Sequence, residues 1–175
     1  MALSKVKNSA VQGLSLSSTS TALSIDANGQ ITKPLQPAFS VHKNNTDQNN
    51  IATETAVAVT FSHERFDVNG DFSSNTFTSP VTGKFKLTVN LRLANLDSAA
   101  GYYVTSIKTS NETYRAIFDP DFGQDAVYWT HSVNVLADMD ANDTASIEIY
   151  QYDGSAQTDV IGNPEYTFFT GYLVC

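Results

Sequence analysis

The stretch GKFKLTVNLRL, residues 83–93, decides the fold class. Apolar residues occupy every second position from Phe85 to Leu93, and Lys, Thr, Asn and Arg fill the positions between them. Successive side chains of a β-strand point to opposite faces, so this alternation predicts a strand with one face in a core and the other in solvent. A helix would need an apolar period of 3.6 residues, which the stretch does not have.

Further segments of strand character follow along the chain, separated by clusters of Gly, Asp, Asn and Pro. They cover residues 38–43, 55–62, 102–109, 113–118, 127–137, 145–152 and 166–174. No stretch of the sequence has a convincing helical period. Many short strands without intervening helices predict an all-β, antiparallel fold of about eight to ten strands, which is either a sandwich or a jelly roll.

Composition excludes several classes of protein. The net charge is −8 and the 10 Lys and Arg residues are scattered, so we expect no nucleic-acid binding. The single cysteine, Cys175, excludes a disulfide-built scaffold. No apolar run is long enough to span a membrane, and residues 1–18 lack the unbroken apolar core of a signal peptide, so we expect neither. Charged residues make up 16%, and a polar but uncharged surface of this kind suits extracellular or virion-surface β proteins.

The last predicted strand has bulky apolar groups on both faces. In YTFFTGYLVC, Phe168 and Tyr172 point one way, and Phe169 and Leu173 point the other way. One face is expected to lie on the sandwich core. The other needs a second cover, which is either another copy of the chain or a long loop over a central strand.

The first 36 residues differ from the rest. Their Ser/Thr-rich beginning is too poor in apolar residues to build a core of its own. In LSIDANGQI, residues 23–31, Asn28 and Gly29 stand between apolar positions, which predicts a β-hairpin with a type I′ turn. An isolated hairpin is marginally stable in water, so this one is expected to pack against its trimer mates or a larger scaffold.

Four segments together carry a family likeness. They are PAFSV at 37–41, FDVNGDFSSNTFTSPVTGKFKLTVNL at 66–91, GYYVTSI at 101–107 and TFFTGYLV at 167–174. In order and spacing they resemble the globular head of the q subunit of the first complement component, a jelly roll shared with the tumour necrosis factor superfamily. The resemblance implies a homotrimer in which the last strand lies near the threefold axis. The residues expected at that trimer interface are Phe39, Phe168, Phe169 and Tyr172.

The lead-in to this head has no collagen repeat. Instead, IDANGQITKPLQPAFSV resembles the lead-ins of bacteriophage fibre and virion proteins. This second, shorter resemblance implies a phage protein at the virion surface, a tail or head fibre. Its parts would be an anchor at 1–20, a stem hairpin at 21–36 and a complement-q-like head at 37–175, with residues 1–36 binding another virion protein.

The candidate chemistry of the chain is sparse. The carboxylate pairs Asp119/Asp121 and Asp138/Asp140 lie in segments between predicted strands, where Asp is a favoured turn residue. Calcium binding at one of these loops is the alternative, because hard cations prefer oxygen ligands. The histidines are dispersed and no nucleophile elbow or phosphate-binding loop occurs. We therefore expect no enzyme activity and no cofactor.

Binding is then expected at the loops remote from the stem, 44–54, 94–100, 119–126 and 153–165. The residues expected to face a ligand are Asn49, Asp97, Asp121, Phe122, Asp125 and Asp153. An exposed aromatic ring beside polar groups suits a sugar, although Phe122 has the alternative of packing in the core, where Trp129 is expected. The leading function is attachment to a host-surface glycan or protein. The alternatives are a structural capsid or tail decoration or adaptor and, least favoured, a polysaccharide-degrading enzyme.

Overall fold

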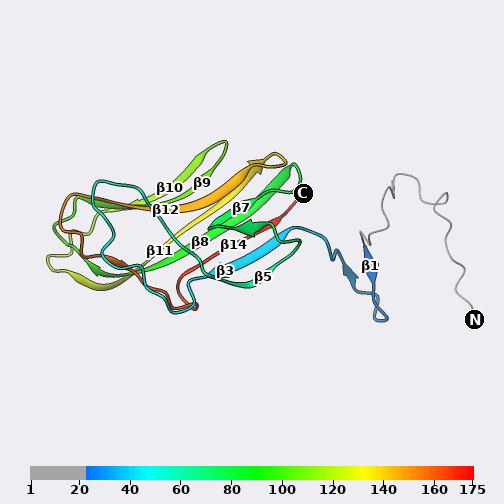
Figure 1. The fold of residues 1–175 in the computed structure, drawn as a ribbon, viewed down its shortest axis with the longest axis horizontal. Helices are drawn as coiled ribbons and strands as arrows, with labels where there is room; N and C mark the ends of the chain where they lie inside the picture. Colours follow the sequence, from blue (N-terminus) through cyan, green and yellow to red (C-terminus); the bar gives the residue numbers. More distant parts are fainter. Residues whose placement is uncertain (1–22) are drawn as a thin grey trace, which may run out of the picture. The chain divides into compact units, whose positions relative to one another are not determined.

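The computed structural model describes residues 23–175, and the chain divides into two compact units, residues 1–35 and Gln36–Cys175. Every regular element of the described residues is a strand (Figure 1). No helix in this part of the chain is long and apolar enough to cross a membrane. Gln36 belongs to the second unit because its side-chain amide donates a hydrogen bond to the carbonyl of Leu173. The predicted division into an anchor at 1–20, a stem hairpin at 21–36 and a head at 37–175 stays a prediction, and its anchor lies outside the described residues.

The described part of the first unit is a hairpin of β1 (Ser24–Ile25) and β2 (Ile31–Thr32). Its turn contains Asn28 and Gly29 as predicted, but Gly29 alone takes a positive φ there, of 80°. A type I′ turn needs positive φ at both positions, so that prediction is wrong. The Asp26 carboxylate accepts hydrogen bonds from the backbone N–H groups of Asn28 and Gln30, each at 2.8 Å, and shapes a wider turn.

The second unit, which we call the head, is a sandwich of two antiparallel sheets (Figure 1). The first sheet, here the outer sheet, has the order β10 (Thr113–Phe118), β9 (Tyr102–Thr109), β12 (Thr144–Tyr152), β7 (Thr76–Thr78), β6 (Phe72–Ser73), with β4 (Val57–Ala58) also paired to β12. The second, here the inner sheet, has the order β11 (Ala126–Met139), β8 (Gly83–Leu96), β14 (Phe168–Leu173), β3 (Ala38–His42), β5 (His63–Asp67), with β13 (Asp159–Val160) also paired to β8. The predicted all-β jelly-roll sandwich is confirmed.

The core lies between the two sheets and follows the alternation of β8. Its inward side chains are completely buried: Phe85, Leu87, Val89, Leu91 and Leu93. Aromatic rings from both sheets fill the core beside them: Phe39 of the inner sheet stacks on Phe77 of the outer sheet at 4.6 Å between ring centroids and lies edge-on to Phe169 at 4.9 Å. Gly171 leaves the room that Phe39 needs, since a Cβ there would lie 2.7 Å from its ring.

Several strands of the head were not predicted. β5, β6, β7 and β13 are short, and the sequence of β5, HERFD, has no apolar alternation because most of its side chains are exposed. Conversely, the predicted strand 55–62 pairs only at β4. The buried Lys43 ammonium explains part of this difference, because it donates hydrogen bonds to the carbonyl and hydroxyl of Thr60 and holds that segment with a side chain.

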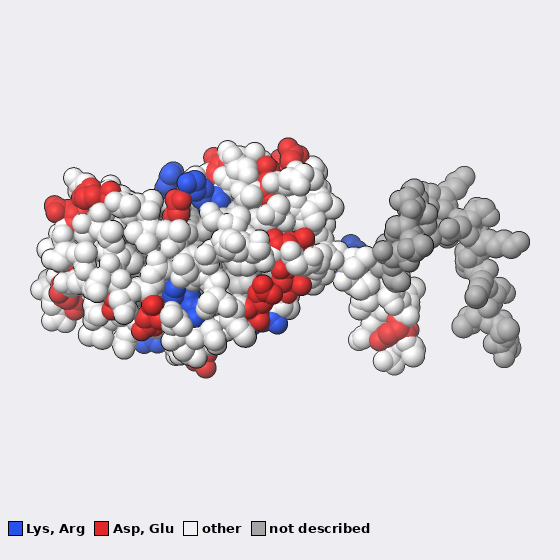
Figure 2. Space-filling model, viewed as in Figure 1, with Lys and Arg blue, Asp and Glu red and all other residues white. Residues whose placement is uncertain are grey.

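The loops gather at the two ends of the sandwich. Figure 1 shows the loops after β3, β8, β10 and β12 together at the end of the head opposite the start of β3 and the C-terminus. These are the four loops predicted to be remote from the stem, and we call them the distal loops. On the face drawn in Figure 2, acidic side chains gather toward both ends of the head, and a group of basic side chains lies between them over β9 and β10.

Candidate binding surfaces

The residues predicted at a trimer interface separate onto two sides of the inner sheet. Phe168 and Tyr172 point outward as the alternation predicts, and Tyr172 is 51% exposed. Phe39 and Phe169 point inward and are completely buried in the core of their own chain. They present no surface to a second copy, so their predicted place at an interface is wrong. The sequence reveals which residues alternate, but the fold decides which side faces the core.

The outward side of the inner sheet has mixed chemistry. The Arg92 guanidinium lies between two exposed tyrosine rings, 3.9 Å from the ring centroid of Tyr128 and 4.4 Å from that of Tyr166. Further along the sheet, the Thr88 hydroxyl donates to the Asn134 side-chain oxygen at 2.7 Å. The sequence gives no sign of the tyrosine–arginine stack, because its members come from three separate segments.

Large apolar side chains are exposed where β10 and β11 border the sandwich. Ile117 is 64% exposed and Val127 is 67% exposed. Trp129 was predicted in the core, but it is 38% exposed at this border, with its ring centroid 5.1 Å from that of Phe122. Phe122 is exposed too, so it does not pack in the core. These two rings help to line a hollow of about 390 Å³ beside Gly123 and Gln124.

The distal loops hold one another through the carboxylates predicted to face a ligand. The nearly buried Asp97 accepts a hydrogen bond from the backbone N–H of Ala99 at 2.8 Å and another from that of Ser155. Asp125 accepts from the N–H and hydroxyl of Ser98 and from the side-chain amide of Gln157. These bonds lower the pKa of Asp125, with the Ser98 N–H as the largest cause. Both carboxylates serve loop structure.

The other predicted ligand-face residues lie on the surface. Asn49, Asp121 and Asp153 are exposed, as is Phe122. The distal loops bring all six residues to one end of the head, but two of the six are committed to loop structure.

The paired carboxylates behave as turn and surface residues. Asp119 accepts a hydrogen bond from the backbone N–H of Asp121 at 3.1 Å, and Asp138 forms an ion pair with Lys84. The Asp140 carboxylate accepts from the Thr82 hydroxyl at 3.3 Å. Among residues 23–175, no three His, Cys, Asp or Glu side chains come together as a metal-binding group.

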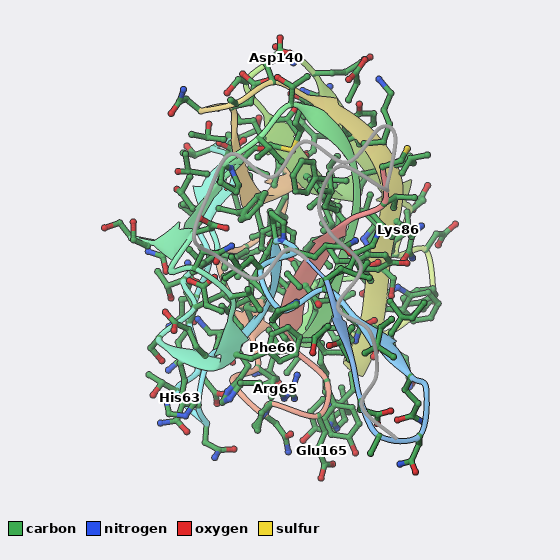
Figure 3. All side chains as sticks on the ribbon, turned by 90° about the vertical axis from the view of Figure 1, so that its right-hand side faces the viewer. His63, Arg65, Phe66, Lys86, Asp140 and Glu165 are labelled. Atoms are coloured by element: carbon green, nitrogen blue, oxygen red, sulfur yellow. The ribbon has the colours of Figure 1, made fainter. Side chains whose placement is uncertain are left out.

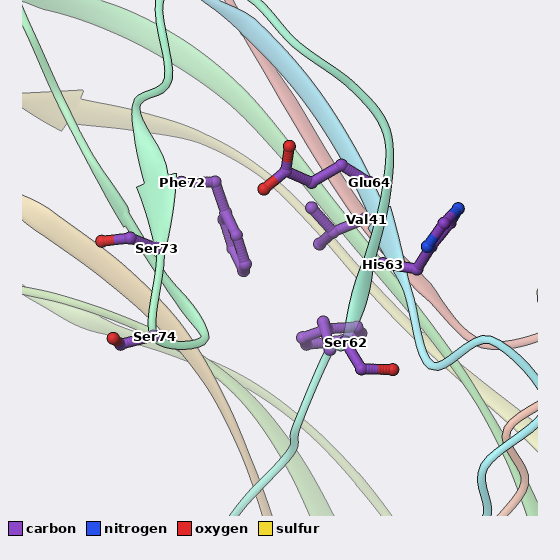
Figure 4. Close-up of a pocket in the computed structure, with 8 residues that line it drawn as sticks. Val41, Ser62, His63, Glu64, Phe72, Ser73 and Ser74 are labelled. Carbon is purple, nitrogen blue, oxygen red and sulfur yellow. The ribbon is translucent and has the colours of Figure 1, made fainter.

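A second hollow of about 390 Å³ opens between β5 and β6, at the other border of the sandwich (Figure 4). Its floor is apolar, formed by Val41, Phe61 and Phe72, and the Glu64 carboxylate and Ser62 lie at its rim. Both sheets end here, so core side chains line the hollow while they stay almost fully buried.

Basic side chains adjoin this hollow on β5, where Figure 3 labels His63 and Arg65. The ring of His63 lies 4.9 Å from that of His42, and the Arg65 guanidinium lies 5.8 Å from the ring centroid of Phe168. Burial, followed by the positive charges of Arg65 and His63, lowers the pKa of His42. Burial and the neighbouring positive charges therefore disfavour protonation of His42.

Comparison with known proteins supports the fold. No family model matches the chain, and no curated protein matches it. Among solved structures, the globular domain of zebrafish complement 1qA protein is similar with a TM-score of 0.57 and 22% identity, over 80% of this chain and 98% of that one. Murine APRIL is similar with a TM-score of 0.56 and 10% identity, over 79% of this chain and 99% of that one. At these identities the likeness establishes a complement-q and tumour-necrosis-factor-like fold.

Proposed function

We propose that the chain is a non-enzymatic virion protein whose head forms a homotrimer and attaches the particle to a host surface. The observation that carries the trimer is the uncovered apolar surface of the inner sheet. Leu136 and Tyr172, which flank Lys86 in neighbouring strands, are 56% and 51% exposed, and Phe66 on β5 is 50% exposed. Apolar groups gathered on one face of a soluble domain mark an interaction site.

The geometry favours a ring of copies. One apolar surface is the outward face of the inner sheet, and the other is the border of that sheet at β11, where Val127 is 67% exposed and Trp129 is 38% exposed. Contact between the border of one copy and the face of the next joins two different patches, which generates a closed ring when the rotation closes. A ring of three agrees with the family resemblance of the head.

The lead-in supports a place on a virion. Its sequence resembles those of phage fibre and virion proteins, and its hairpin carries Ile25 and Ile31, each 64% exposed. Uncovered isoleucines on a marginal hairpin suit a segment that packs against another protein. Residues 1–36 would then bind another virion protein, and the head would stand at the virion surface with its distal loops available to a host glycan or protein.

A structural decoration or adaptor remains the second candidate function. Asp97 and Asp125 hold the distal loops together, which reduces the chemistry that those loops can offer to a ligand. The head of an adaptor protein needs stable loops, but it needs no ligand-binding site in them.

The trimer is tested by mass. Light scattering after size-exclusion chromatography of the full chain should give three times the chain mass of 19.0 kDa. Tyr172→Asp would replace an apolar ring by a carboxylate that has to be desolvated in the contact, and should yield monomer. Tyr152→Asp is the matched control, because Tyr152 is a 43% exposed tyrosine on the outer sheet. A wild-type monomer, or equal loss of trimer in both variants, would refute the assembly.

Attachment is tested by competition. Purified trimer is added to host cells before the phage that carries it, and phage adsorption is counted. Dose-dependent loss of adsorption that disappears in a Phe122→Ser variant supports attachment through the distal loops. A folded trimer that neither binds cells nor competes would favour the decoration or adaptor role.

A further inference from the structure

The outward face of the outer sheet carries a hollow that none of the functions above uses. It has a volume of about 350 Å³ and is lined by side chains of β9, β10 and β12, among them Tyr102, Val104, Arg115, Ile117, Glu148 and Tyr150. A volume of this size is within the range of about 300–1,000 Å³ that small-molecule sites occupy.

The strand register builds the hollow in rows. One row pairs Tyr102 with Tyr152, and the next places Val104 between Tyr150 and Ile117. Cross-strand neighbours on one face lie within side-chain contact of each other. The hollow is therefore aromatic and apolar toward the distal loops.

The tyrosines form a fixed platform. Tyr102 stacks on Tyr152 with ring centroids 4.9 Å apart and an interplanar angle of 10°, and its ring lies 6.1 Å from that of Tyr150. The Tyr150 hydroxyl donates a hydrogen bond to the Glu54 carboxylate at 3.1 Å, and that carboxylate also accepts from the backbone N–H of Asp153. A platform held in this way loses little freedom when a ligand covers it.

The opposite end of the hollow is polar and carries an unneutralised cation. There, the third row places Ser106 between Glu148 and Arg115. Glu148 is already paired with Lys108 at 2.9 Å, whereas Arg115 is exposed and has no ion pair within residues 23–175. The basic side chains of this region stand out between the acidic ends of the head in Figure 2. In a chain of net charge −8, a local cation beside an aromatic platform selects for anionic ligands.

We propose that this hollow binds a carboxylate-bearing saccharide. The apolar face of a sugar ring lies on the tyrosine platform, and its carboxylate pairs with the planar guanidinium of Arg115, which matches carboxylate geometry. The Ser106 hydroxyl and the Glu148 carboxylate lie in the same row as Arg115, where hydroxyls next to the sugar carboxylate need partners.

The site does not depend on the distal loops or on a place in the virion. In the proposed trimer the contact uses the inner sheet, so three hollows on the outer sheets stay open. Three weak sites on one particle would bind a repetitive acidic polymer with avidity.

The experiment is calorimetric titration of the full chain with three acidic probes: tetragalacturonate, tetraguluronate and sialyllactose. The uncharged counterparts are the methyl esters of tetragalacturonate and tetraguluronate, and lactose. At least one acidic probe should bind, and its uncharged counterpart should bind about tenfold more weakly or worse, because a charge-assisted hydrogen bond is lost. The variants are Arg115→Gln and Tyr102→Ala in the hollow, with Phe122→Ser in the distal loops and Arg65→Gln on the inner sheet as controls.

Loss of about tenfold in affinity in Arg115→Gln, greater loss in Tyr102→Ala and no change in the controls would support the site. Absence of binding by all three acidic probes, or equal binding of charged and uncharged probes, would overturn it. Loss of binding in Phe122→Ser with full binding in Arg115→Gln would also overturn it, and would instead place the ligand at the distal loops of the proposed function.

Discussion

Replacement of Gly171 by alanine tests how tightly the core closes over the last strand. The added Cβ would lie 2.6 Å from the Leu87 Cδ2 atom and 2.7 Å from the Phe39 Cε1 atom, where ordinary contacts begin near 3.4 Å. Both neighbours are completely buried, and Phe39 is packed against further rings, so neither can move away without disturbing others. Overpacking of this kind costs about 1–3 kcal/mol.

The assay is urea denaturation of the full chain, at one protein concentration, followed by the fluorescence of its single tryptophan, Trp129. Gly171→Ala should lower the midpoint at an unchanged m-value, and should lower Tm by roughly 2–12 °C. The matched background is Leu87→Ala, which removes one of the two atoms in the way. In this background, Gly171→Ala should lower the free energy of unfolding by about 0.5–3 kcal/mol less than it does in the wild-type chain.

A neutral Gly171→Ala variant would show that the core is looser than the packing of Phe39 and Leu87 implies. Equal costs in the wild-type and Leu87→Ala backgrounds would show that the penalty arises elsewhere. Either result would refute the argument that Gly171 is required for close approach of its own chain.

Three further substitutions have expected outcomes. Burial raises the pKa of Asp71, and the Asp67 charge adds to the shift. The free energy of unfolding therefore falls as the pH rises from the ordinary to the raised pKa of this carboxyl group. Asp71→Asn should be more stable than wild type at pH 7, and a denaturation series should show this gain vanishing at acid pH. Burial lowers the pKa of His131, so the free energy of unfolding falls as the pH drops below about 6.5, the ordinary pKa of histidine. His131→Gln should reduce this loss of stability in the same denaturation series. Asp125→Ala should speed amide hydrogen exchange at Ser98, while Asp121→Ala should not.

The sequence was a good guide wherever a property depends on strand geometry alone. Alternation placed every inward residue of β8 correctly, and it separated Phe168 and Tyr172 from Phe169 on β14, because successive side chains of a strand must point to opposite faces. It failed for β5, whose exposed residues need no apolar alternation.

Predictions that needed the neighbouring sheet were less reliable. Phe39 was expected at a subunit interface and lies in the core, because the pattern of β3 does not say which side the outer sheet covers. Trp129 occupies an inward position of β11, but the two sheets end beside it, so the ring reaches solvent. An inward position buries a side chain only where the opposite sheet continues over it.

The candidate saccharide site shows the same limit from the other side. Tyr102 and Tyr150 are 48 positions apart in the numbering, and Arg115 belongs to a third strand. Alternation groups each of them with the residues two positions away on its own strand, but only the register of β9 with β10 and β12 places them in adjacent rows. A shift of one residue in either pairing would turn the outward side chains of the shifted strand into the core, so the register that protects the core also assembles the platform. A binding face on this fold is therefore set by the pairing of strands, and the distal loops need not contain the only one.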